Sequence, residues 1–221
     1  MMPARTLAEL QLETIQASRR GVTGIATAAV VLALAGTLGL WLPARVTELV
    51  LLGGMGLIFP LGLLVNHVLG IHFFSKANPL GTLSGLVAGG QLLFAPLFIG
   101  LYFKHTPQLL LLVGVVAGTQ FLVCAWLYSS RTYWFLTIAT VGVAYGGSLL
   151  FSANSLVLLP WSMAVVCALG VLGLLQENRA DQPIRAAADS LTAKPKPVAE
   201  REQAEEIRCN PFFELLSSSS V

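Results

Sequence analysis

Residues 105–130 read HTPQLLLLVGVVAGTQFLVCAWLYSS, a run without a single charged side chain between Lys104 and Arg131. An α-helix rises about 1.5 Å per residue, so about 20 apolar residues cross the roughly 30 Å hydrocarbon layer of a bilayer. The run therefore predicts one membrane-spanning helix. Four further uncharged runs divide the middle of the chain in the same way: residues 21–44, 49–75, 77–103 and 132–176.

The last of these runs is too long for one crossing, and the polar sequence Ser152-Ala153-Asn154-Ser155 divides it. We therefore predict an all-α fold, a polytopic transmembrane bundle of six helices. The strands of a membrane barrel would alternate polar and apolar residues, and no segment of this chain does so. The expected spans lie near residues 21–41, 47–69, 80–103, 107–129, 131–151 and 156–176.

Charged residues are confined almost entirely to the two ends of the chain. Of 13 Lys and Arg and 11 Asp and Glu, only five lie between residues 21 and 176. Soluble domains carry about 25% charged residues, whereas this chain has 11%. The distribution excludes a water-soluble globule, a disulfide scaffold and a nucleic-acid-binding protein. The five internal charges are Arg45, Glu48, Lys76, Lys104 and Arg131.

The two polar ends differ from each other. Residues 1–20 contain Thr6-Leu7-Ala8-Glu9, which fits a helix capping box, and we expect a short helix there. Residues 177–221 contain too little apolar surface to fold alone, so we expect a disordered tail.

Positively charged residues predict the orientation in the membrane, because Lys and Arg concentrate in cytoplasmic loops. With six spans both ends lie on one side, and that side carries eleven Lys and Arg against two on the other. We expect both termini in the cytoplasm and the protein in a bacterial plasma membrane. The lipid bilayer is thus the first predicted partner.

Two glutamines and two prolines lie near the middle of their predicted spans. Gln91 lies 14 residues before His105 and Gln120 lies 15 after it, so antiparallel neighbouring helices bring them to one depth. Pro60 and Pro96 each remove a backbone hydrogen bond at similar depth. Broken helices around a midplane site are typical of transporters. The four residues form a candidate polar site, although interhelical hydrogen bonding and ordinary kinks would explain them equally well.

Glycines recur at four-residue spacing in three predicted spans. Small residues at this spacing let helix backbones approach closely, either within the bundle or between two membrane proteins. The pattern predicts helix packing, with a homo-oligomer or another membrane protein as a possible partner. The glycines are Gly81, Gly85, Gly89, Gly114, Gly118, Gly142 and Gly146.

Motifs of known chemistry are missing from the sequence. There is no Cys-x-x-Cys pair, His-x-x-x-His pair, Gly-x-Ser-x-Gly turn or phosphate-binding loop. No charged side chain lies in the interior of a predicted span, where proton relays and voltage sensors carry ionisable groups. We therefore predict no catalytic residue, no metal site and no cofactor.

Three stretches carry a resemblance to a known family: residues 56–62 (GLIFPLG), residues 73–83 (FFSKANPLGTL) and residues 126–131 (WLYSSR). Over residues 15–176 the chain resembles a family of small bacterial multi-pass membrane proteins that is defined as a domain of unknown function. The resemblance implies an integral membrane domain of six or seven helices and assigns no activity.

Three hypotheses for function follow from the sequence. The first is binding or transport of a small neutral or amphipathic molecule at the midplane site. The second is a packing or assembly subunit of a membrane complex that associates through the glycine-rich helices. The third is a membrane-embedded lipid enzyme, for which no nucleophile, base and orienting group converge by spacing.

Overall fold

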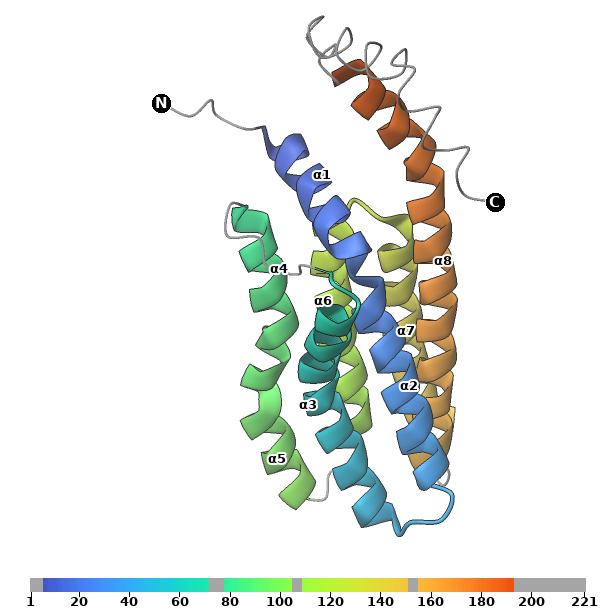
Figure 1. Ribbon diagram of the computed structural model, residues 1–221. Coiled ribbons are helices and arrows are strands. Elements are labelled where there is room, and N and C mark those ends of the chain that lie inside the picture. The colour runs from blue at the N-terminus through green and yellow to red at the C-terminus, as the bar shows by residue number, and fades with distance from the viewer. Residues whose placement is uncertain (1–5, 72–77, 105–108, 151–154, 193–221) are drawn as a thin grey trace, which may run out of the picture. The chain divides into compact units, whose positions relative to one another are not determined.

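The computed structural model describes residues 6–71, 78–104, 109–150 and 155–192, and this part of the chain is helical with no strand (Figure 1). The predicted all-α fold is confirmed. The elements are α1 (Leu7–Ser18), the 3₁₀ turn η1 (Arg19–Gly21), α2 (Val22–Leu38), α3 (Ala44–Val68), α4 (Pro79–Gly89), the 3₁₀ turn η2 (Gly90–Phe94), α5 (Ala95–Phe103), α6 (Leu109–Leu127), α7 (Arg131–Leu150) and α8 (Ser155–Thr192).

The chain divides into two compact units, residues 1–179 and residues 180–221. The first holds the bundle and every site described below. In the second, the described residues up to Thr192 continue α8, so the helix extends beyond the expected end at residue 176 into the segment expected to be a tail. The sequence Arg185-Ala-Ala-Ala-Asp-Ser-Leu191 is rich in good helix formers, which accounts for the extension. The rest of the expected tail, residues 193–221, lies outside the described residues.

Five helical segments in the described part of the chain are long and apolar enough to cross a membrane. The segment Arg131–Leu150, α7, is not among these five segments. α7 packs along its length between α6 and α8. Glycines of both neighbours lie against it: Gly118 against Val141, Gly170 against Leu136 and Gly173 against Thr132.

A left-handed turn separates the short surface helix from the first span. α1 begins with a capping box, in which the Glu9 amide donates to the Thr6 hydroxyl and the Thr6 amide donates to the Glu9 carboxylate at 2.9 Å. After α1, three successive residues have positive φ, namely Arg19 (48°), Arg20 (57°) and Gly21 (67°). L-residues rarely adopt this region, so the turn depends on partners outside it. Tyr133 and Asn178 are two such partners, because each donates a hydrogen bond to a carbonyl oxygen of the turn.

The predicted packing glycines fall into different environments. Gly114 and Gly118 of α6 leave no room for a side chain, because a Cβ there would collide with Ala144 and Val141 of α7. The α7 pair Gly142 and Gly146 has no atom within 4 Å of an added Cβ. In α4, Gly81 and Gly85 are buried, and a Cβ at Gly89 would lie 3.7 Å from the Phe59 ring.

The third span is interrupted at mid-length, where η2 joins α4 to α5 (Figure 1). Gly89 and Gly90 weaken the helix on one side, and Pro96 removes a backbone donor on the other. In contrast, α3 continues through Pro60 without a break. Short 3₁₀ segments inside a helix often mark a hinge or a functional site.

Candidate functional site

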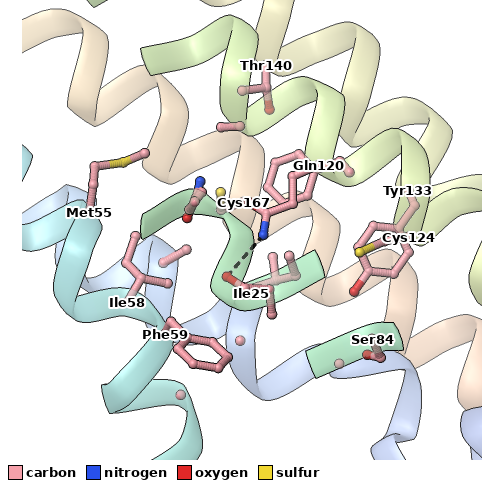
Figure 2. Close-up of a pocket in the computed structure, with 18 of the residues that line it drawn as sticks. Ile25, Met55, Ile58, Phe59, Ser84, Gln120, Cys124, Tyr133, Thr140 and Cys167 are labelled. Atoms are coloured by element: carbon pink, nitrogen blue, oxygen red, sulfur yellow. Dashed lines mark hydrogen bonds between the residues drawn. The ribbon is translucent and has the colours of Figure 1, made fainter. Parts of the chain in front are cut away.

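A cavity of about 140 Å³ lies inside the bundle and is lined by residues of α2, α3, α4, η2, α6, α7 and α8 (Figure 2). Its wall is largely apolar, with Ile25, Met55, Ile58 and Phe59 among the side chains drawn. None of the described residues that line it is charged. The cavity therefore offers an uncharged, mostly apolar interior with a few polar groups.

Two of the four residues predicted to form a midplane site line this cavity. Gln91 and Gln120 are both half-buried in its wall. Pro60 and Pro96 are not among the lining residues, and both are exposed on the outer surface. Pro96 nevertheless contributes to the 3₁₀ interruption in which Gln91 lies.

Gln120 of α6 bonds to the interrupted helix instead of to Gln91. Its Nε2 donates to the carbonyl oxygen of Val87 at 2.7 Å and to that of Ala88 at 3.3 Å. Both carbonyls belong to the last turn of α4, next to η2. The side-chain amide thus caps the end of α4 and holds Gln91 and Gln120 at one level.

Most polar groups of the cavity wall already have partners in the protein. Ser84 and Tyr128 share a hydrogen bond of 2.8 Å. Tyr133 donates to the carbonyl oxygen of Arg20 at 2.7 Å and so satisfies part of the left-handed turn. At another point the hydroxyl of Thr23 donates to Asn66 Oδ1. These polar groups bond to one another or to the backbone of the protein, so they leave few hydrogen-bonding positions for a ligand.

Thr140 is different, because its buried hydroxyl has no hydrogen-bond partner among the described residues. The residue is 3% exposed and lines the cavity, and in Figure 2 the hydroxyl points toward the other cavity side chains. Helical Ser and Thr commonly bond to the carbonyl four residues earlier. Thr27, Thr37, Thr137 and Ser162 do so here. Leaving such a hydroxyl unpaired costs about 1–3 kcal/mol.

A second cluster of polar side chains surrounds Glu177 of α8. Its carboxylate accepts hydrogen bonds from Ser130 Oγ at 2.6 Å and from the amide and hydroxyl of Thr132 at 2.9 and 2.8 Å. It also forms an ion pair of 2.8 Å with Arg20, whose side chain is 10% exposed.

The neighbouring Asn178 donates to the carbonyl oxygen of Arg19 at 3.1 Å. The beginning of α2, the α6–α7 turn and α8 are therefore joined at one end of the bundle. The Glu177 carboxylate and the turn find their partners within this cluster, whereas Asn178 Oδ1 is buried without a hydrogen-bond partner among the described residues.

Among the described residues, no three His, Cys, Asp or Glu side chains gather closely enough to hold a metal ion. Cys124 and Cys167 are free thiols that both line the cavity. The lining thus supplies hydrogen-bonding and apolar contacts only.

Comparison with known families bears on these observations. A family model described as "Family of unknown function (DUF7010)" matches residues 7–177. The chain belongs to this family. The match spans α1 to the Glu177 cluster, which confirms the resemblance to a family of unknown function and extends it at the N-terminus. Neither the search of curated proteins nor the search of solved structures gave a match.

Sequence reasoning missed two of the residues that matter most. Thr140 is one of several hydroxyls in a span, and only the fold shows that its hydroxyl faces a cavity. Glu177 resembled the first residue of a polar tail. A sequence signal for it did exist, because it is the first charge after a run of 45 uncharged residues.

Proposed function

We propose that this membrane protein binds a small, neutral, mostly apolar molecule with one hydrogen-bonding group inside the cavity of its helical bundle. The observation that carries the proposal is the unpaired Thr140 hydroxyl in a cavity whose described lining carries no charge. A ligand's polar group would satisfy that hydroxyl and recover the cost of burying it.

The size of the cavity sets the scale of the ligand. An engineered apolar cavity of about 150 Å³ in another protein binds benzene, and this cavity measures about 140 Å³. A molecule with one aromatic ring is therefore a suitable probe. An ion is disfavoured, because a charge in an apolar interior without a countercharge costs many kcal/mol.

The proposal also includes an orientation in the membrane. We propose that both ends of the 1–179 unit face the cytoplasm of a bacterial cell. The ion pair between Arg20 and Glu177 supports it, because it brings the beginning of the first span and the end of the last to one side. Reporter fusions after residue 179 should show cytoplasmic activity, and periplasmic activity would reverse the assignment.

Binding is best tested with two probes that differ by one polar group, 4-fluorophenol and 4-fluorotoluene, followed by ¹⁹F NMR on protein in lipid nanodiscs. Nanodiscs without protein give the background partitioning into lipid. Unmodified protein should show a bound signal and prefer the phenol by about tenfold, the value of one hydrogen bond.

Three variants separate cavity binding from adsorption. Gly24→Leu should abolish the bound signal, because Gly24 lines the cavity and has no atom within 4 Å of an added Cβ. Thr140→Val should bind both probes equally. Thr137→Val is the matched control, since that hydroxyl already bonds to Tyr133 O at 2.9 Å. Equal signals from unmodified protein and Gly24→Leu for both probes would contradict the proposal.

A further inference from the structure

A second, larger hollow of about 390 Å³ lies between α3 and the η2–α5 half of the third span. We call it the lateral groove. Apart from Gln91 and Tyr102 its described lining is apolar or glycine, with Leu49, Met55, Phe98 and Ile99 among its side chains.

The lateral groove faces the hydrocarbon of the bilayer. Leu49 is 55% exposed on α3, and Ile99 is 53% exposed on α5. In an apolar span, side chains that the protein leaves open meet lipid. At the end of the groove, the Arg45 guanidinium lies 5.8 Å from the centre of the Tyr102 ring and donates to the Tyr102 carbonyl at 3.2 Å. Such charged and aromatic groups are typical of the membrane surface.

The groove and the central cavity share part of their walls. Met55 of α3 and Gln91 of η2 line both. Neither is a rigid barrier: Met is unbranched with three rotatable bonds, and Gln91 lies in a 3₁₀ segment whose hydrogen-bond geometry is poorer than that of an α-helix. No residue of η2 is buried. A small displacement of these two side chains would join the two spaces.

We propose that the lateral groove is the portal through which the ligand of the central cavity enters from the bilayer, passing between Met55 and Gln91. This inference rests on the proposed function and narrows its ligand class. A molecule that reaches the cavity by this path first dissolves in the hydrocarbon layer, so the ligand is a neutral, lipid-soluble compound. A water-soluble metabolite such as a sugar or an amino acid would not partition into the groove.

Glycines on the floor of the groove allow a direct test. Gly53 and Gly56 have no atom within 4 Å of an added Cβ, so leucine at both positions should fill the groove without disturbing the helix. Gly142→Leu is the matched control, because Gly142 also has open space around it but lines neither the cavity nor the groove. Ile99→Trp blocks the groove from its opposite wall and serves if the double glycine variant does not fold.

The measurement is the exchange rate of 4-fluorophenol between lipid and cavity, by ¹⁹F saturation transfer in nanodiscs, together with its Kd. A blocked portal should slow association and dissociation together by about tenfold or more and leave the Kd within about twofold. Gly142→Leu should leave both rates unchanged.

Unchanged exchange in folded groove variants that still bind the probe would overturn the portal and leave cavity binding intact. The absence of any bound signal in the unmodified protein would overturn both. A change in Kd with no change in the association rate would also contradict a portal, because it would mean that the groove is part of the binding site itself.

Discussion

The two sides of the bundle are built differently. On one side, α6, α7 and α8 pack so closely that glycines of α6 and α8 lie directly against α7 side chains. Nine of the nineteen residues of α6 are buried. On the other side, Phe98 is the only buried residue of α5, and η2 has none. The central cavity lies between these two regions.

This difference shows how a membrane domain can hold a cavity without collapsing around it. Lipid is as apolar as the helix surfaces, so close packing by small residues is what fixes helices together. α6 to α8 have such contacts and form a fixed wall that carries Thr140 and Gln120. The interrupted third span, with fewer buried residues, is the part that can move.

The largest expected effect comes from overfilling the close-packed side. Gly114→Leu places a side chain against Ala144 and Met163, and we expect destabilisation of about 3 kcal/mol or more. Gly142→Leu lies in α7 on the same close-packed side, but its added Cβ meets no neighbouring atom within 4 Å. It should change the free energy of unfolding by less than about 0.5 kcal/mol. Thermal unfolding in one detergent measures both. Equal losses in the two variants would mean that the α6–α7 contact is not close.

The second-largest expected effect is on stability and compares two ion pairs, one on each side of the bundle. Glu177→Gln removes the carboxylate charge that pairs with Arg20, whose side chain is 10% exposed, and that accepts hydrogen bonds from Ser130 and Thr132, and should cost about 3 kcal/mol. Glu48→Gln on α3 breaks a pair of 3.4 Å with Arg45, whose side chain is 44% exposed, and should cost less than about 1 kcal/mol. The same melting assay compares them, and a larger loss for Glu48→Gln would reverse the assignment of the rigid side.

How far the sequence predicts this structure depends on the kind of interaction. The spans follow from charge-free runs, because the cost of a charge in hydrocarbon is set by the residue itself. The prediction that Gln91 and Gln120 share one depth rests on their distances to one turn, since helix rise is constant, and both line the central cavity. These features depend on residues close in sequence.

Features that depend on contacts between residues far apart in the sequence could not be predicted from it. Pro60 and Pro96 look alike in sequence, yet α3 continues through Pro60 and the third span is interrupted before Pro96. There Gly89 and Gly90 precede the proline, and Gln120 bonds to backbone carbonyls of α4. The partners of Glu177 come from residues 20, 130 and 132. Spacing alone cannot reveal such contacts.

The smallest expected effect bears most directly on the central claim, that an unpaired hydroxyl is kept in the cavity for a ligand. The measurement is the melting temperature of Thr140→Val, with and without 4-fluorophenol. Valine has nearly the same shape without the hydroxyl, so without ligand the variant should be more stable by about 1–3 kcal/mol, a rise of a few degrees. The phenol should then raise the melting temperature of the unmodified protein more than that of Thr140→Val. A variant that is no more stable, and that responds to the phenol as the unmodified protein does, would contradict the account.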